Sequence, residues 1–364
     1  MTLNTISTAI TFLLLIVFSN ACRQKAESLL SKTSFALETK GDTVRPLIIT
    51  EPAAHDTDDA AIWVNIEDLS KSLIIGTDKD SLGALYVYDL GGKIILERTV
   101  KGLTRPNNVD VEYGFDLNGK ATDIVVVTER FTNMIRVFRM PDMKPLDDGG
   151  IQVFENERYR SPMGVAIYKR ASDRAFFVIV GRKEGPAEGY LWQYQLNATK
   201  SGNIAAHLVR KFGAWSGKEE IESIAVDDKL GFVYYSDETH GIRKYFADSQ
   251  MGDEELALFG TTGFAEDQEG ISVYEQTDST GYILVSDQQA SRFHIFSREG
   301  TNGLPHDYTL IKTVQVAAKE SDGSDVTNQS FNNEFPGGLF VVMSDDRTFH
   351  YYSWQSLMGD RNVE

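Results

Sequence analysis

The sequence predicts an all-β fold, a six-bladed β-propeller with four-stranded antiparallel blades. A two-strand pattern occurs six times along the 364 residues, with starts about 50 to 57 residues apart. The strands in it are short, β-branched and aromatic, and Gly, Asp and Asn separate them, which is typical of propeller blades. No helical pattern is long enough for a second domain, and no low-complexity linker interrupts residues 45–355. One domain, residues 44–358, is therefore expected.

Each element of a blade has its place in this pattern. The repeated pattern supplies the two middle strands, in residues 72–90, 123–140, 175–196, 231–246, 281–297 and 338–354. An inner strand precedes it, as at 109–113 and 270–274, and a more variable outer strand follows it, as at 150–154 and 310–314. An open ring would leave exposed strand edges. Residues 44–50 are therefore expected to form the outer strand of the last blade and so close the ring.

Large aromatic side chains recur in the predicted strands. We expect most of them to pack between blades, including Trp63, Tyr88, Trp192, Tyr245 and Trp354. Their structural role leaves the polar residues at the strand ends as the candidates for function.

Composition excludes several classes of function. The net charge of -17 argues against a nucleic-acid partner, because that affinity is built from clusters of Lys and Arg. A single cysteine, Cys22, excludes an internal disulfide framework and a thiolate metal cluster. The acidity suits a protein that binds hard cations.

The first 43 residues have the composition of an export signal and a tether. An apolar run at 10–18 is followed by Ser19-Asn20-Ala21-Cys22, so residues 1–21 are expected to be a signal peptide. The run is too short to span a bilayer. The site resembles a bacterial lipoprotein box, which implies a lipid on Cys22, a polar tether over 22–43 and an exported, outer-membrane, cell-surface or periplasmic lipoprotein. The alternative is plain secretion with an incidental Cys22.

Acids and amides recur where the predicted inner strands begin. Asp58-Asp59 precede an apolar strand, and Asn108 with Asp110, Glu222, and Asp267 with Glu269 occupy similar places. Each alone is explained by a turn before a strand. Because inner strands converge around the axis of a propeller, these carboxylates should meet at one channel mouth, where they would repel one another without a cation. Oxygen ligands without paired His or Cys favour calcium over zinc or copper.

Basic residues follow the first three repeats at equivalent positions. They are Lys79, Arg130 and the pair Arg182-Lys183. Each alone is explained as a solvated loop charge, but the shared position in the repeat favours a common role. Fixed cations beside carboxylates that bind metal form a site for a polyanion with several phosphates.

Taken together, these motifs resemble the β-propeller phytases, the alkaline, calcium-dependent phosphatases of inositol hexakisphosphate. The resemblance covers about residues 45–356. The motifs that carry it are Asp58-Asp59 with Ala61-Ile62-Trp63, Thr77-Asp78-Lys79, 85–90, Asn107-Asn108-Val109-Asp110, Gly164 with 181–185, Glu222 with 225–228, Asp267-Gln268-Glu269-Gly270, and Ser321-Asp322-Gly323.

The resemblance implies roles for single residues. Calcium ligands would be Asp59, Glu222, Asp267, Glu269 and Asp322, with Asp58, Asn108, Asp110 and Glu238 around the same cluster. Phosphate would be held by Lys79, Arg130 and either Lys183 or Arg182, next to the catalytic position Glu222. The implied mechanism is direct attack of a calcium-bound water on phosphorus, with a second phosphate at an adjacent affinity site. Several Ca²⁺ ions, a small polyphosphorylated inositol substrate and a monomer are expected.

Three departures from the family pattern bear on the affinity site for phosphate and on one structural calcium. Asp80 stands where a second Lys usually follows, Met163 where a phosphate-contacting Tyr is expected, and 343–347 lacks an Asp-Gly-Glu-Asn-like run of calcium ligands. The loop at 322–328 is also shortened. Two other functions stay open at this point: a six-bladed calcium-dependent lactonase or esterase, against which Lys79 and Arg130 argue, and a noncatalytic surface-binding propeller.

Overall fold

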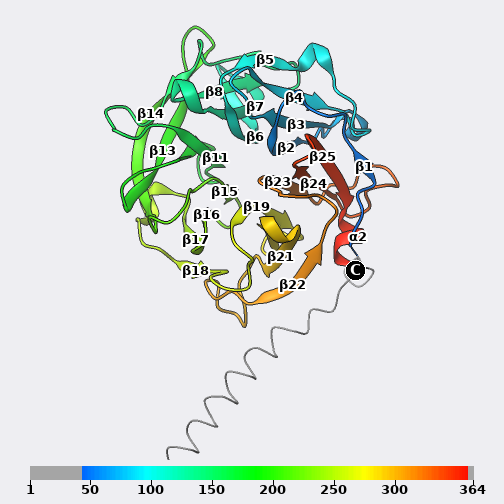
Figure 1. The fold of residues 1–364 in the computed structure, drawn as a ribbon. Coiled ribbons are helices and arrows are strands. Elements are labelled where there is room, and N and C mark those ends of the chain that lie inside the picture. Colours follow the sequence, from blue (N-terminus) through cyan, green and yellow to red (C-terminus); the bar gives the residue numbers. More distant parts are fainter. Residues whose placement is uncertain (1–42, 360–364) are drawn as a thin grey trace, which may run out of the picture. The chain divides into compact units, whose positions relative to one another are not determined.

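A computed structural model describes residues 43–359, whose strands form six antiparallel sheets around a central axis (Figure 1). The predicted all-β, six-bladed propeller is confirmed. From the inside outward, the first blade consists of β2 (Thr57–Trp63), β3 (Leu73–Asp78), β4 (Gly83–Tyr88) and β5 (Val100–Leu103), and the second of β6 (Pro106–Leu117), β7 (Lys120–Glu129), β8 (Met134–Arg139) and β10 (Ile151–Gln152), with β9 (Lys144–Pro145) also paired to β8. The third blade consists of β11 (Pro162–Lys169), β12 (Phe176–Arg182), β13 (Glu188–Ala198) and β14 (Ile204–Ala214), and the fourth of β15 (Ile224–Asp227), β16 (Phe232–Asp237), β17 (Gly241–Phe246) and β18 (Ala257–Phe259). The fifth blade consists of β19 (Gln268–Glu275), β20 (Gly281–Asp287), β21 (Arg292–Ser297) and β22 (Leu310–Gln315), and the sixth of β23 (Ser324–Thr327), β24 (Leu339–Ser344), β25 (Thr348–Ser353) and β1 (Ile48–Ile49).

The helices of the described residues are short and connect strands. They are η1 (Leu69–Lys71), η2 (Leu96–Arg98), η3 (Arg130–Thr132), η4 (Ser249–Met251), η5 (Gln288–Ala290) and α2 (Trp354–Met358). None of them has the length and hydropathy needed to cross a bilayer. Two of them, η3 and η5, begin where a second strand ends, at the same end of the ring as the starts of the inner strands.

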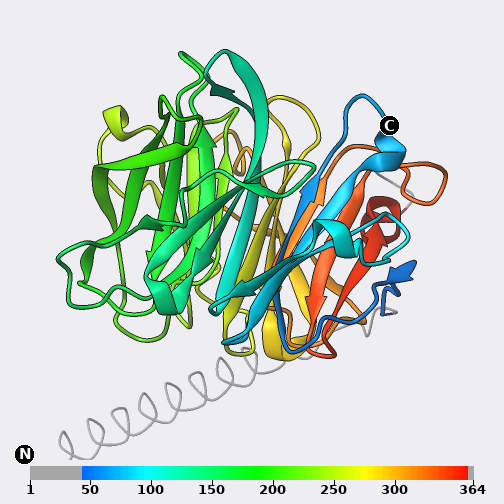
Figure 2. The ribbon, with the colours of Figure 1, turned by 90° about the horizontal axis from the view of Figure 1, so that it is seen from above.

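The first strand of each blade lies nearest the axis. Figure 1 shows β2, β6, β11, β15, β19 and β23 around the centre, and Figure 2 shows the blades turned by 90°. In every blade the strands follow one another in the same order from centre to rim. The six inner strands therefore begin at the same end of the central channel, which we call the mouth. Residues far apart in sequence are brought together there.

The last blade is closed by the start of the described chain. Strand β1 pairs antiparallel with β25, with Ile48 opposite Tyr351 and Ile49 opposite His350. This confirms the predicted closing strand, although its regular part is two residues long rather than the whole of 44–50. Thr50 extends the junction, because its backbone N–H donates to the Phe349 carbonyl at 3.0 Å and its Oγ1 accepts from the Phe349 N–H at 2.9 Å. Closure removes an open sheet edge that would otherwise pair with another chain.

The apolar core consists of six clusters, each between two neighbouring blades. Trp63, Tyr88, Trp192, Tyr245 and Trp354 are all buried in them, as predicted. In one such contact the rings of Tyr274 and Trp354 stack with centroids 3.6 Å apart. Burial of aromatic side chains between blades stabilises the closed propeller.

The expectations for residues 1–42 lie outside the described residues. They comprise the signal peptide, the lipid on Cys22 and almost all of the polar tether.

Candidate functional site at the channel mouth

Four inner strands change register where they enter the mouth. The shifts fall at the starts of β2, β6, β11 and β19. A β-bulge breaks the regular alternation of side chains and re-aims the residues within it. The residues displaced in this way are Asp58-Asp59, Asn107-Asn108, Met163-Gly164 and Glu269-Gly270. Most of the predicted site residues of these strands therefore occupy irregular positions.

Two glycines let neighbouring blades approach closely at the mouth. A Cβ added to Gly164 would lie 2.1 Å from the carbonyl oxygen of Glu222, and one added to Gly323 would lie 2.2 Å from Asp59 Oδ1. Any side chain at either position would push a site residue away. The close packing of the inner strands therefore fixes where the acids lie.

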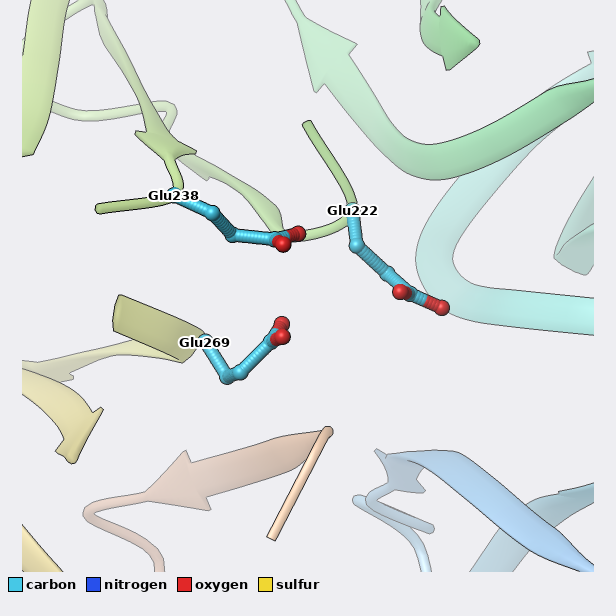
Figure 3. A group of neighbouring side chains, drawn as sticks. All are labelled: Glu222, Glu238 and Glu269. Atoms are coloured by element: carbon cyan, nitrogen blue, oxygen red, sulfur yellow. The ribbon is translucent and has the colours of Figure 1, made fainter. Parts of the chain in front are cut away.

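Three predicted acids form one cluster. Glu222 precedes β15, Glu238 follows β16 and Glu269 lies in β19, and each offers a carboxylate oxygen within 4.8 Å of those of the other two. Figure 3 shows the three side chains coming from separate segments around one space. The structure thus brings together Glu222 and Glu269, which are distant in sequence.

Burial and mutual repulsion disfavour the ionised forms of these acids. Burial raises the pKa of Glu269 well above its usual range, and the charges of Glu238 and Glu222 raise it further. Burial also raises the pKa of Glu238 to about 8, with Glu220 and Asp267 contributing. The same causes, burial first and Asp58 next, raise the pKa of Glu222. A bound cation would relieve this repulsion.

The donor set of the cluster fits a calcium ion. Glu238 Oε1 and Glu269 Oε2 are buried and have no hydrogen-bond partner among residues 43–359. Leaving such oxygens unpaired is costly. All three groups are carboxylates, with neither His nor Cys among them, and hard cations such as calcium prefer oxygen ligands.

Lys79 lies between two further predicted acids. Its Nζ is 2.9 Å from Asp322 Oδ2 and also contacts Asp58 Oδ1. Burial alone would lower the pKa of Lys79, but Asp58, Asp322 and Glu222 outweigh it and raise the pKa. Burial raises the pKa of Asp322 to about 7, against the opposing effect of Lys79. The predicted cation and the predicted carboxylates therefore belong to one charge cluster.

Asn107 connects the two halves of this cluster. Its Nδ2 donates to Asp58 Oδ2 and to Glu222 Oε1, both at 3.0 Å, while its own Oδ1 is buried without a hydrogen-bond partner among the described residues. The sequence predicted a site role for Asn108 only. Asn107 stands next to it at the same strand entrance, and that position was the sequence signal for its role.

Two glutamines in η5, which sequence reasoning missed, hold two of the predicted ligands. Gln289 Nε2 donates to Asp267 Oδ2 at 2.6 Å, and Gln289 Oε1 accepts from the Asp267 backbone N–H at 3.0 Å. Gln288 Nε2 donates to Asp322 Oδ1. Nothing in the local sequence singled them out, because their role depends on a contact between a loop and two distant strand entrances.

Asp59, Asn108 and Asp110 extend from the mouth into the channel. Asp59 Oδ2 accepts from Asn108 Nδ2 at 3.3 Å and from the Val109 N–H at 3.0 Å. These three predicted residues line a channel cavity of about 110 Å³ together with Asp325, a half-buried acid that was not predicted from the sequence.

Asp110 is held by backbone rather than by the glutamate cluster. Its Oδ2 accepts from the Ile167 N–H at 2.7 Å, and burial, with a contribution from Asp325, raises its pKa to about 7. The structure therefore places Asp110 in the channel wall, apart from the cluster of Glu222, Glu238 and Glu269.

Arg130 is a buried cation with no acidic partner. It is 8% exposed, and among residues 43–359 no carboxylate lies within ion-pair distance of it. One Nη contacts the sulfur of Met163, the residue that stands where Tyr was expected, and Nε has no hydrogen-bond partner in the described chain. Burial lowers the pKa of Arg130, and the charge of Glu222 acts in the opposite direction. Its guanidinium is available to an anion.

The structure separates the alternatives Arg182 and Lys183. The Arg182 side chain is 1% exposed and packs against the rings of Phe154, Tyr190 and Trp192, with Glu157 Oε2 at 3.5 Å. The Arg182 guanidinium therefore lies in the packing between aromatic rings, and its role in holding phosphate stays a prediction. The next side chain, Lys183, is 44% exposed and pairs with Glu220, whose charge also acts on Glu238.

The sites of the three departures have structural roles. Asp80 accepts hydrogen bonds from its own loop, at Ser81 and Leu82, and Met163 is fully buried. Met343 belongs to the core, and Arg347 donates to the Ala54 carbonyl at 3.1 Å.

Comparisons with known proteins agree with this site. The profile of the Phytase family matches residues 3–351. The chain is 27% identical over 329 residues to a 3-phytase of Bacillus subtilis (strain 168), covering 85% of this chain and 82% of that protein. Among solved structures it is similar to the Dos1 propeller (TM-score 0.42, 12% identity, 82% and 67% coverage) and to the WD40 propeller domain of Doa1 (0.47, 14%, 81% and 78%). At these TM-scores the two likenesses support no conclusion. The family match over nearly the whole chain shows that this protein belongs to the phytase family and is a phosphoric monoester hydrolase.

Proposed function

We propose that the protein hydrolyses inositol hexakisphosphate, phytate, to lower inositol phosphates and phosphate, and that it depends on calcium. The observation that carries the proposal is the juxtaposition, at one channel mouth, of a carboxylate cluster with unpaired oxygens and a buried arginine with no acidic partner. Each feature is costly when buried, because the unpaired carboxylate oxygens of Glu238 and Glu269 lack a contacting cation and the guanidinium of Arg130 lacks an anion. A metal ion together with a phosphate group supplies both.

Glu222, Glu238 and Glu269 would hold calcium, with Asp58, Asp59, Asp267 and Asp322 around them. When bound, calcium neutralises the carboxylates, polarises phosphoryl oxygens and favours ionisation of an attacking water. Asn107 keeps Asp58 and Glu222 at a fixed separation through two hydrogen bonds from one amide. Gln288 and Gln289 orient Asp322 and Asp267 from outside the cluster.

The cations of the mouth would bind the phosphate that reacts. Arg130 has N–H donors without acidic partners. Lys79 is joined to the acids of the mouth by its ion pair with Asp322, and Lys183 by its ion pair with Glu220. Arg and Lys donate charge-assisted hydrogen bonds to phosphate oxygens. Fixed cations of this kind lower the barrier by stabilising charge that develops in the transition state. Glu222, which shares the amide of Asn107 with Asp58 and also belongs to the glutamate cluster, would accept the proton of the attacking water.

The test is an assay of phosphate release from inositol hexakisphosphate in chelator, after back-titration with calcium, and with magnesium instead. We expect release that is absent in chelator and restored by calcium. Equal release in chelator and in calcium would contradict the calcium part of the proposal. No release under any condition would contradict the substrate.

A second proposal concerns the export of the chain, and the amino-terminal sequence supports it. Residues 1–21 would direct export, and Cys22 would carry the lipid that anchors the protein to a membrane. Metabolic labelling with a palmitate analogue should mark the parent but not Cys22→Ala. Labelling of both would exclude lipidation at Cys22, and retention of both in the cytoplasm would exclude export. Light scattering during size-exclusion chromatography checks the expected monomer.

A further inference from the structure

An acidic cavity lies beside the candidate site, on the mouth face between the fourth and fifth blades. It measures about 600 Å³, and its lining includes Glu219, Glu266, Asp267, Gln268 and Phe264. Three threonines also line it, and neither Lys nor Arg is among its lining residues. Because carboxylates gather here without a cation, the cavity disfavours phosphate groups and attracts a ligand that carries positive charge.

Gln268 provides a buried acceptor in this cavity. It is 3% exposed, and its Nε2 donates to the Gly260 carbonyl at 3.3 Å. Its Oε1 is buried and has no hydrogen-bond partner among residues 43–359. Glu219 and Glu266 are exposed, and within the same part of the chain neither of them forms an ion pair with Lys or Arg. A buried amide oxygen without a donor is costly, so a ligand that brings N–H donors is favoured.

The main chain beside both glutamates is anchored. The Ala265 N–H donates to Asp287 Oδ1 at 2.9 Å, next to Glu266. Trp215 Nε1 donates to the carbonyl oxygen of Glu219 at 2.6 Å. Both carboxylates therefore extend from segments that are already held in place, so a ligand loses less free energy in ordering these loops when it binds.

The charges of the mouth are unevenly distributed around the ring. The candidate phosphate-binding cations come from the first three blades, where Lys79 follows β3, Arg130 begins η3 and Lys183 follows β12. The acidic cavity joins the candidate site at Asp267, which lines the cavity and accepts a hydrogen bond from Gln289. A substrate with a phosphate at one end and a positive charge at the other would match both sides of the mouth.

We infer that this cavity binds the ammonium group of a further class of substrate, the phosphate monoesters of amino alcohols. The inference rests on the proposed function for the reacting phosphate and extends it to esters with a single phosphate and a cationic alcohol. Gln268 Oε1 accepts a hydrogen bond from the ammonium, Glu219 and Glu266 balance its charge, and the ring of Phe264 faces it. In the reaction the P–O bond to the amino alcohol breaks, the oxygen of water takes its place on phosphorus, and the alcohol oxygen gains one proton of that water.

The test compares two esters of equal length, 2-aminoethyl phosphate and 2-hydroxyethyl phosphate, in calcium. We expect kcat/KM of the parent to be about tenfold higher for the amino ester, because its ammonium gains charge-assisted hydrogen bonds that the hydroxyl lacks. In the double variant Glu219→Gln with Glu266→Gln, this ratio should fall to about twofold. Glu184→Gln is the matched control: it removes an exposed acid at the mouth end of the third blade, outside the cavity lining, and should keep the parental ratio.

A binding measurement separates this inference from the hydrolysis of inositol hexakisphosphate. Calorimetric titration of the calcium-loaded parent with 2-aminoethylphosphonate and with 2-hydroxyethylphosphonate, whose P–C bonds resist hydrolysis, should show about tenfold tighter binding of the amino compound. If the parent releases no phosphate from inositol hexakisphosphate, the proposed function fails while this titration still decides the ammonium site. Equal affinity for the two phosphonates, the binding of neither included, would overturn the inference. A preference that survives unchanged in the double variant would overturn it too.

Discussion

Arg130 and Asn107 show how single side chains define the mouth. One is a cation without a carboxylate partner, and the other is an amide that donates to two carboxylates and leaves its own oxygen unpaired. Buried polar groups are normally satisfied, so a group of unsatisfied ones gathered at one channel mouth favours a binding site there. The sequence predicted Arg130 from its repeat position, but the role of Asn107 depends on a distance between two blades that only the folded ring sets.

Replacing Arg130 by Ala should lower turnover of inositol hexakisphosphate about a hundredfold, corresponding to roughly 2 to 4 kcal/mol in the transition state, by analogy with other removed electrostatic donors. The melting temperature should stay the same or rise, because the cation is buried without an acidic partner. Arg130→Lys serves as the matched control and should retain part of the activity. Full activity in Arg130→Ala would remove this residue from the site.

At the scale of elements, the bulged starts of the inner strands set the geometry of the site. Alternation along a regular strand would send Asp58 and Asp59 to opposite faces, so period-two reasoning from sequence could place both at a strand entrance but not orient either. The register shift supplies that orientation. The same limit explains Arg182 and Lys183, where the sequence left two alternatives and the strand buried the first.

Gly323→Ala tests how closely the sixth and first blades must approach. Its Cβ would lie 2.2 Å from Asp59 Oδ1, so the variant should lose roughly 1 to 3 kcal/mol of stability by overpacking. Its calcium affinity should fall as well, because Asp59 moves. Urea denaturation and calcium titration measure the two effects, and Gly91→Ala, whose Cβ would stay 3.2 Å from its nearest neighbour, is the control. Parental values of both quantities in Gly323→Ala would show that the close approach is not required.

At the scale of the whole propeller, sequence periodicity was sufficient for the blade number, the strand order and the closing strand. Closure of the ring brings buried acids close together at the mouth, which makes their ionised forms unfavourable. This effect appears in the raised pKa of Glu238, about 8, and of Asp322, about 7, both chiefly because of burial. Burial therefore favours the protonated forms of these acids over their ionised forms.

Stability in chelator should therefore fall as pH rises. Between the ordinary pKa of Glu238, 4.5, and its raised value of about 8, the native state holds a proton that the unfolded state has released, so raising pH favours unfolding. Urea denaturation at several pH values should show a falling free energy of unfolding in chelator and a flatter profile in calcium, which displaces the protons. Glu238→Gln should flatten the chelator profile. Identical slopes with and without calcium in the parent would contradict the account.

The central claim is that Glu222 and Glu269, from different blades, serve one calcium site. Calcium titration of Glu222→Gln and Glu269→Gln, followed by melting temperature and by phosphate release, tests it most directly. Each change removes a charge and a ligand oxygen from the same cluster, so both variants should need more calcium than the parent for stabilisation and for turnover. Parental calcium dependence in both variants would contradict the shared site, and a loss confined to one of them would show that the two glutamates do not converge on one ion.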